Sequence, residues 1–168
     1  MTYTNTVLPF FLFTLFIGTS NAQDVELHTG CDCPTIRLDD AYCVSNAVFE
    51  GTALSNDTIY ASGDIKPVAR DVVQHTSTRF QVTRSIKGGS SGTTIVRSTV
   101  GTDDCGFHFI PGKRYLVFAT LEDGALHTDR CDATRSLEGI TAAFRDSLAF
   151  VEAGHRWEGS VPLDGPCK

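Results

Sequence analysis

The sequence predicts a small, mainly β domain that is held together by disulfides. Three observations predict it. Short runs of alternating apolar and polar residues follow one another between turn signals, six cysteines are spread along the chain, and one helix-period stripe lies near the carboxyl end. Strand signals at such short spacing are expected of a small barrel or sandwich.

The amino terminus predicts a secretory signal peptide. Residues 7–18 are almost wholly apolar, and no charged side chain precedes Asp24. The run is short for a membrane span, which takes about 20 residues, and the small residues at 20–22 suit a cleavage site. We expect a signal peptide over 1–22, a short extension over 23–30 and one domain over 31–168. The mature protein is then extracellular, or periplasmic in a bacterial host, and free of the membrane.

The first half of the domain contains a short helix, a strand and a long loop. The run TIRLDDAYC predicts a helical turn that ends at Cys43, and VSNAVFEGTAL alternates as a strand with one buried face should. The stretch 55–76 is predicted to be an irregular loop, which in a compact domain is usually functional or flexible. It contains the sequon N-D-T, which predicts glycosylation of Asn56 in a eukaryotic host.

A hairpin and further strands follow. The run TRFQVTRSIKG places Phe80, Val82 and Ile86 on one face, and GGSSG leads into TTIVRSTV, so the pair predicts a β-hairpin. The glycine run lacks the spacing of a phosphate-binding loop. The run KRYLVFATLEDGALHT predicts another strand, a turn at Asp123-Gly124 and a short return.

One helix is predicted near the carboxyl end, in SLEGITAAFRDSLAFVEAG. Ser136 or Thr134 is expected to cap its start, and Gly154 to end it. Its polar face is mixed in charge, which favours packing on the sheet over binding at a membrane surface. The apolar stripe consists of Leu137, Ile140, Phe144, Leu148 and Val151.

All six cysteines follow the predicted signal peptide, and an even number in an exported chain predicts three disulfides. We expect the side chains of Cys31 and Cys33 to point to opposite faces of an extended segment, and each to reach a distant partner. A zinc site made of two C-x-x-C pairs and a thioredoxin-like C-x-x-C are both absent. Metal binding and free thiols remain the alternatives.

The sequence contains no catalytic motif. The five histidines form no H-E-x-x-H pattern, and no G-x-S-x-G elbow occurs. Calcium binding by Asp103-Asp104 stays open, although the EF-hand pattern is missing. The net charge of −6 argues against a nucleic-acid partner. We expect neither an enzyme nor a bound cofactor.

Several motifs occur in an order that resembles a known family. They are the C-x-C pair, Cys43 ten residues beyond Cys33, the V-x-x-x-x-K-G run from Val82 to Gly88, Cys105-Gly106, Gly112-Lys113, Asp123-Gly124 and the closing DGPC. This order is similar to that of the netrin-like domain. Within that group it most resembles the amino-terminal domain of the tissue inhibitors of metalloproteinases. The resemblance extends from Cys31 to Cys167.

The resemblance implies a five-stranded OB-type barrel with packed helices. It also implies the disulfides Cys31–Cys105, Cys33–Cys131 and Cys43–Cys167. In that family the leading cysteines form a rigid ridge that enters the proteinase cleft. The amino nitrogen and carbonyl oxygen of the first cysteine chelate the catalytic zinc, and the residue between the two cysteines enters the main specificity pocket. These roles are carried over to Cys31, Asp32, Cys33 and Pro34.

Two features depart from that family pattern. Residues 23–30 precede Cys31, and the amide nitrogen that they create cannot serve as an amine ligand, so Cys31 contacts the target's zinc only as the mature terminus. Asp32 brings a carboxylate to a pocket that is usually apolar, which costs desolvation unless the target supplies a cation.

We therefore expect a monomeric, protein-binding module that has no metal of its own and docks its C-D-C-P ridge in a zinc endopeptidase. The alternative is a non-inhibitory adhesion or matrix module that binds glycans or structural proteins through the barrel face or the 55–76 loop.

Overall fold

The computed structural model describes residues 31, 33–60, 73–89, 91–99, 105–160 and 167. The expected signal peptide, the extension over 23–30, Asp32 and Asp103-Asp104 lie outside these residues. None of the helices within the described ranges is long and apolar enough to cross a membrane. The elements are α1 (Leu38–Val44), β1 (Ala47–Tyr60), β2 (Val73–Lys87), β3 (Thr93–Thr99), β4 (Arg114–Glu122), β5 (Ala125–His127), β6 (Arg135–Ser136), the 3-10 helix η1 (Leu137–Gly139) and α2 (Ala142–Glu152).

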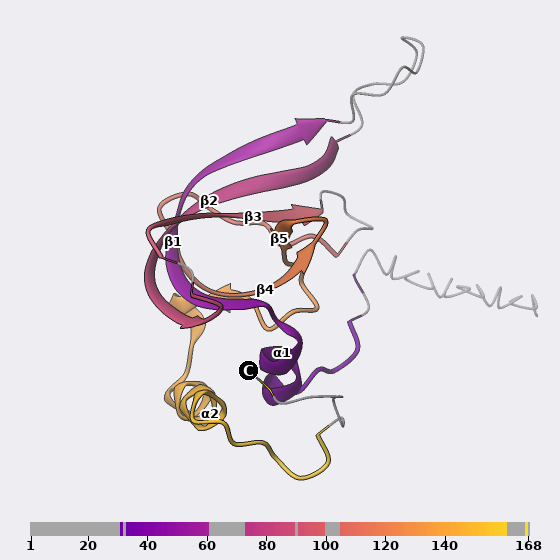
Figure 1. The fold of residues 1–168 in the computed structure, drawn as a ribbon. Helices are drawn as coiled ribbons and strands as arrows, with labels where there is room; N and C mark the ends of the chain where they lie inside the picture. Colours follow the sequence, from indigo (N-terminus) through magenta and orange to yellow (C-terminus); the bar gives the residue numbers. More distant parts are fainter. Residues whose placement is uncertain are drawn as a thin grey trace, which may run out of the picture.

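The strands pair into a closed ring (Figure 1). β1 pairs antiparallel with β2, and β2 pairs antiparallel with β3. β3 pairs parallel with β5, β5 pairs antiparallel with β4, and β4 returns antiparallel to β1. The two-residue β6 adds to β4. The predicted mainly β domain, with two helices of which one lies near the carboxyl end, is confirmed.

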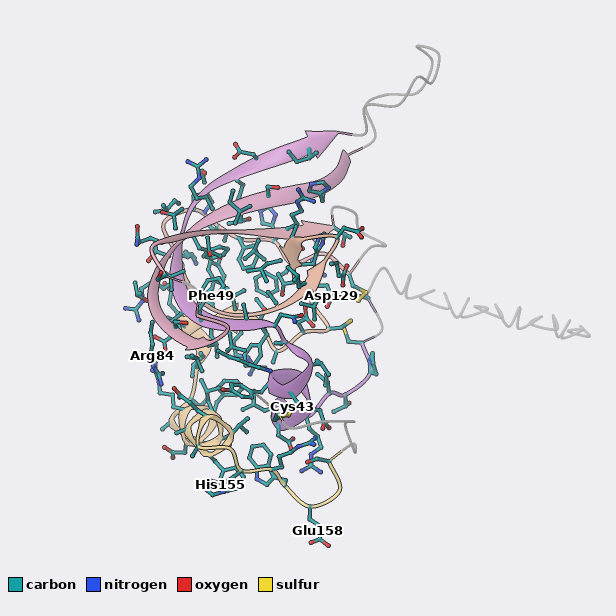
Figure 2. All side chains as sticks on the ribbon, in the orientation of Figure 1. Cys43, Phe49, Arg84, Asp129, His155 and Glu158 are labelled. Carbon is teal, nitrogen blue, oxygen red and sulfur yellow. A yellow bond between two sulfur atoms is a disulfide. The ribbon has the colours of Figure 1, made fainter. Side chains whose placement is uncertain are left out.

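The core has two parts, one on each face of β1 and β4. Within the ring, Phe80 contacts Phe109 edge to face, with ring centroids 4.8 Å apart, and Phe109 contacts Tyr115 at 5.0 Å. Phe49 belongs to this cluster, and Figure 2 places it within the ring. On the other face, side chains of β1 and β4 pack against both helices in a second cluster that includes Val48, Leu116, Phe118, Tyr42, Leu148 and Val151.

The predicted hairpin and tight turn are present. β2 and β3 pair with Phe80 opposite Thr94, and Phe80 is buried whereas Gln81 is exposed. Asp123 and Gly124 join β4 to β5 with φ angles of 49° and 76°. Two positive φ angles in a two-residue turn match the right-handed twist of the strands on either side.

The prediction of an irregular loop over 55–76 is wrong at both ends. β1 continues to Tyr60 and β2 begins at Val73, and the two strands pair along this length with Thr58 opposite Thr76. We call the end of β1 (55–60) together with the start of β2 (73–76) the arm. Asp57 and Ile59 of the arm are both exposed, so the arm has no alternating apolar face that the sequence could reveal. Residues 61–72 lie outside the described ranges.

The carboxyl-terminal helix starts later than predicted. Ser136 caps only the 3-10 turn η1, and α2 begins after Thr141, whose hydroxyl accepts a hydrogen bond from the Phe144 amide. The hydroxyl of Thr134 is buried and donates instead to the carbonyl oxygen of Phe118. The prediction that Gly154 ends the helix is confirmed, because its φ of 86° is incompatible with further helix.

Candidate functional site

The cysteines are joined in three disulfides, Cys31–Cys105, Cys33–Cys131 and Cys43–Cys167. These are the pairs that the resemblance implies. Two of them attach the leading segment to the strand ring, and the third attaches α1 to the carboxyl end. Pro34 follows the attached cysteines and is exposed.

The partners of Cys31 and Cys33 are distant in sequence but lie on one connected base. The amide of Arg130 donates to the carbonyl oxygen of Cys105 at 2.6 Å, and the Arg130 Nε donates to that of Gly106 at 3.0 Å. Gly106 also forms an antiparallel bridge with Asp129. Residues 105–106 and 129–132, which we call the base, therefore hold both cysteines in a fixed relation.

Two aspartates shape the turn of this base. Asp129 Oδ1 accepts hydrogen bonds from the amides of Cys131, at 2.7 Å, and Asp132, at 2.9 Å. Asp132 Oδ2 in turn accepts from the Asp129 amide at 3.0 Å. Burial raises the pKa of Asp132 above its ordinary value, and this effect exceeds that of the Asp129 amide, which lowers it.

A close backbone approach explains the glycine after Cys105. A Cβ atom on Gly106 would lie only 1.9 Å from the carbonyl oxygen of Thr99, at the end of β3. A side chain at this position would push β3 away from the base, so the base forms only with glycine here.

The expectation that Cys31 and Cys33 point to opposite faces is wrong. Their sulfur atoms lie 3.4 Å apart, and the Cys31 sulfur lies 3.3 Å from that of Cys131. Residues two apart in an extended segment share a face, which is the physical reason. All four sulfur atoms, including that of Cys105, lie within 4.8 Å of one another in a half-buried cluster. The fold thus brings together four cysteine sulfur atoms, a ligand type that soft metals prefer, and the cysteine spacing did not predict this cluster.

Downstream of the ridge, α1 is fixed by a buried carboxylate. Asp39 is fully buried and accepts hydrogen bonds from the amide of Trp157, at 3.2 Å, and the hydroxyl of Ser160. Arg37 Nε lies 3.4 Å from the other carboxylate oxygen. Burial alone would raise the pKa of Asp39, but these two hydrogen bonds and the Arg37 charge together hold it below its ordinary value.

A comparison with known protein families matches most of this chain. The model of the family described as tissue inhibitor of metalloproteinase matches residues 29–153, which is most of the chain and includes the ridge, the base and α2. The chain belongs to the tissue inhibitor of metalloproteinase family. No curated protein matches the chain at a significant level.

The family-like V-x-x-x-x-K-G run now has a structural explanation. Lys87 Nζ donates to the carbonyl oxygens of Tyr42, at 2.7 Å, and Cys43, at 2.9 Å, which are left free at the end of α1. Gly88 has a φ of 79°, and a Cβ atom there would lie 2.2 Å from the carbonyl oxygen of Asn46. Sequence reasoning noted this run only as a resemblance, and its role in holding α1 was missed.

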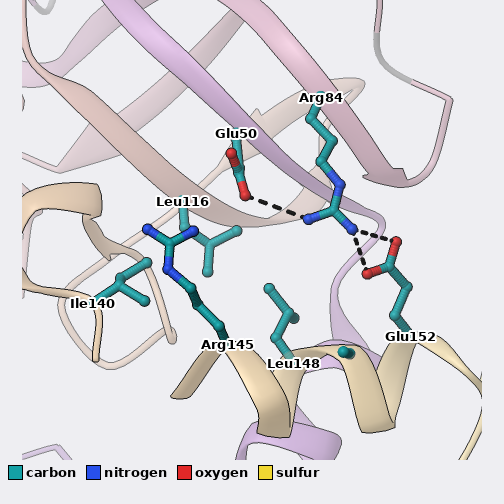
Figure 3. Close-up of a pocket in the computed structure, with 8 residues that line it drawn as sticks. Glu50, Arg84, Leu116, Ile140, Arg145, Leu148 and Glu152 are labelled. Atoms are coloured by element: carbon teal, nitrogen blue, oxygen red, sulfur yellow. Dashed lines mark hydrogen bonds and ion pairs between the residues drawn. The ribbon is translucent and has the colours of Figure 1, made fainter. Parts of the chain in front are cut away.

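A pocket of about 190 Å³ lies between α2 and the sheet (Figure 3). Arg84 of β2 binds both carboxylate oxygens of Glu152, at 2.8 and 2.6 Å, and lies 3.4 Å from a carboxylate oxygen of Glu50. None of the lining residues belongs to the ridge or the base. We interpret Arg84 as a structural residue whose ion pair with Glu152 holds α2 of this family member on the sheet.

The predicted glycosylation residue lies beside the aromatic core. Asn56 Nδ2 donates to the carbonyl oxygen of Phe109 at 2.7 Å, and its Oδ1 accepts from Thr78 at 2.9 Å. One amide proton is engaged in this way, and a glycosylated asparagine still retains one amide proton. Glycosylation of Asn56 stays a prediction.

Proposed function

We propose that the protein is a secreted inhibitor of a zinc metalloproteinase, and that its ridge docks in the cleft of the enzyme. The membership in the inhibitor family supports a metalloproteinase-inhibitor-like domain and a proteinase as partner. We further propose that the closed ring is the OB-type barrel of that family, which its strand order and the return of β4 to β1 support. The ridge consists of Cys31, Asp32, Cys33 and Pro34.

The attachment of both leading cysteines to one base is the observation that carries the docking proposal. The base is held by its own hydrogen bonds, so Cys31 and Cys33, which it anchors through disulfides, have little freedom to lose on binding. Binding segments that are rigid before association lose less conformational entropy, and this favours affinity. The exposed Pro34 adds to the rigidity because its ring restricts φ.

Direct zinc chelation requires a free amino group on Cys31. We propose that the signal peptide is removed after residue 22 and that a second protease then removes residues 23–30. The new amine carries a lone pair for the target's zinc, whereas the amide of the longer chain does not. The Cys31 carbonyl oxygen supplies the second ligand atom.

The charge near the base favours a target with a basic cleft rim. A hollow of about 240 Å³ beside the base is lined by Glu122, Asp129 and Asp132 among others. The ridge sequence contains one carboxylate of its own, that of Asp32. Complementary charge steers association and discriminates between partners, so we expect proteinases with cationic clefts to bind best.

The decisive experiment compares three forms of the secreted, disulfide-bonded protein against a panel of zinc endopeptidases. One begins at Gln23, one at Cys31 and one carries a single alanine before Cys31. We expect the Cys31 form to inhibit at least about a hundredfold more strongly than the alanine form, because only the free amine can bind zinc. Inhibition by none of the three would refute the proposal, and equal inhibition by all three would refute zinc chelation.

The arm formed by β1 and β2 supports the alternative, a non-inhibitory matrix or glycan-binding module. It extends beyond the ring (Figure 1) and carries exposed polar side chains such as Asp57 and Thr58. Retention of the protein on a glycan array, unchanged by Asp32→Ala and lost when 57–76 is replaced by a short turn, would favour that function.

A further inference from the structure

We propose that the sulfur cluster behind the ridge is a second, redox-dependent site. When a dithiol reduces the two disulfides, one Zn²⁺ ion binds as a tetrathiolate to Cys31, Cys33, Cys105 and Cys131. The zinc then ties the leading segment to the base in place of the disulfides. This inference does not depend on the proposed inhibitory function.

The positions of the sulfur atoms carry the proposal. Tetrahedral zinc with Zn–S bonds of about 2.3 Å holds its sulfur atoms about 3.8 Å apart. The contacts between the two disulfides, at 3.3 and 3.4 Å, are already close to that value, and no pair in the cluster exceeds 4.8 Å. Each disulfide-bonded pair must open from about 2.05 Å, which takes about 1 Å of movement per sulfur atom.

The base keeps Cys105 and Cys131 together after reduction because its own contacts do not involve sulfur. The hydrogen bond from Arg130 to Cys105 and that from Cys131 to Asp129 are both made by backbone atoms of the cysteines. A single residue separates Cys31 from Cys33 in the chain, so the two cysteines approach the base as a pair. The half-burial of all four cysteines leaves a path for the ion while it excludes part of the solvent.

The chemistry balances with these components alone. Each disulfide accepts two electrons and two protons from one dithiol, which is itself oxidised to a disulfide. The four thiols then release four protons as zinc binds, and the ion undergoes no change of oxidation state. The site carries a net charge of −2, which the guanidinium of Arg130 partly offsets through its place beside Gly106. An all-thiolate ligand set favours zinc over magnesium or calcium.

The test uses the full mature chain with a phosphine reductant, which is oxidised to its oxide with oxygen from water and adds no thiol that competes for metal. Two double variants give a matched pair, since each removes one disulfide. Cys43→Ser with Cys167→Ser leaves the four proposed ligands intact, and Cys33→Ser with Cys131→Ser removes two of them. Cobalt(II) serves as the probe, because its visible and charge-transfer bands report tetrahedral thiolate coordination.

We expect the reduced protein and the Cys43/Cys167 variant to bind one cobalt per chain, with zinc displacing it, and the oxidised protein to bind none. The Cys33/Cys131 variant should bind at least about a hundredfold more weakly. Under reduction, zinc should also raise the midpoint of thermal unfolding of the Cys43/Cys167 variant and leave that of the Cys33/Cys131 variant unchanged. Absence of thiolate bands in the reduced protein, or equal binding by the two variants, would overturn the proposal.

Discussion

Asp39 and Trp157 are joined by a hydrogen bond from the Trp157 amide to Asp39 Oδ2, at 3.2 Å, across 118 residues of sequence. Together with the Cys43–Cys167 disulfide, this bond attaches the carboxyl-terminal segment to α1. Because α1 directly follows the ridge, the last residues of the described chain help to fix the first. Asp39 thus joins α1 to the carboxyl-terminal segment from a buried position.

Replacement of Asp39 should destabilise the protein strongly. Asp39→Ala removes the acceptor of the Trp157 amide and one of the two acceptors of the Ser160 hydroxyl, and it takes a buried negative charge away from Arg37. We expect a loss of about 3 kcal/mol in the free energy of unfolding. Urea denaturation measures it. Asp146→Ala, on the exposed face of α2, is the control and should change stability by less than about 0.5 kcal/mol. Equal effects of the two changes would show that the buried carboxylate contributes nothing.

The acid side of the stability profile should depend on the same carboxylate. The pKa of Asp39 is lower in the folded protein than in the unfolded chain. Its contribution to stability is therefore complete above the unfolded pKa and is lost as the pH falls through the folded pKa, below about pH 4. Asp39→Asn should flatten the loss of stability in this range. Thermal unfolding of both proteins between pH 2 and pH 7 checks it, and parallel curves would contradict the assignment.

The ionisation of Asp132 should affect the pH dependence of stability in the direction opposite to that of Asp39. Its folded pKa is raised, chiefly by burial, so ionisation opposes folding once the pH exceeds the ordinary aspartate pKa. Asp132→Asn keeps an acceptor for the Asp129 amide and removes the charge. We expect the variant to gain stability over the wild type as the pH rises from 3 to 7, measured by the same unfolding curves. A variant that loses stability over that range would show that the charge is favourable in the folded protein.

Substitution of Gly106 tests whether the close approach between the base and β3 constrains the protein. Gly106→Ala places a Cβ atom 1.9 Å from the backbone oxygen of Thr99, and a backbone neighbour cannot move aside as a flexible side chain can. We expect a loss of at least about 2 kcal/mol in unfolding free energy. Gly139→Ala is the matched control, because nothing lies within 4 Å of its Cβ position. If both variants unfold at the same urea concentration, the close approach at the base does not constrain the protein.

Local signals predicted much of the fold, and long-range contacts explain what they missed. The alternation around Phe80 and the turn at Asp123-Gly124 depend on neighbouring residues, so both were visible in the sequence. The arm formed by the end of β1 and the start of β2 was missed because its residues, with Asp57 and Ile59 both exposed, form no alternating apolar pattern. The carboxyl-terminal helix was extended too far because one apolar stripe continues through η1 and α2.

The cysteine pairs were predicted, but the geometry around them was not. The resemblance implied which cysteines pair, whereas the fixed relation of Cys105 to Cys131 depends on hydrogen bonds of Arg130 and Asp129 that no spacing rule describes. The buried Asp39 was likewise hidden, because an aspartate pair in a sequence usually indicates a solvated turn. Its partners lie in a segment more than a hundred residues away.

Lys87 provides a test of how α1 is held. Its Nζ donates to two carbonyl oxygens at the carboxyl end of α1, and burial lowers its pKa below the ordinary lysine value. Lys87→Met keeps most of the side-chain volume but leaves both oxygens without this donor. We expect a loss of about 1–3 kcal/mol in unfolding free energy.

The control for Lys87→Met is Lys113→Met, which removes a more exposed lysine that lies 3.6 Å from Glu138. Surface ion pairs of this kind contribute less than about 1 kcal/mol, so this variant should unfold close to the wild type. Hydrogen exchange of the α1 amides separates a local effect from a global one. Faster exchange in α1 of the Lys87 variant, with α2 unchanged, is the expected result because the Lys87 ammonium donates to the end of α1. Equal protection of α1 in both variants would show that the helix is held by its disulfide and Asp39 alone.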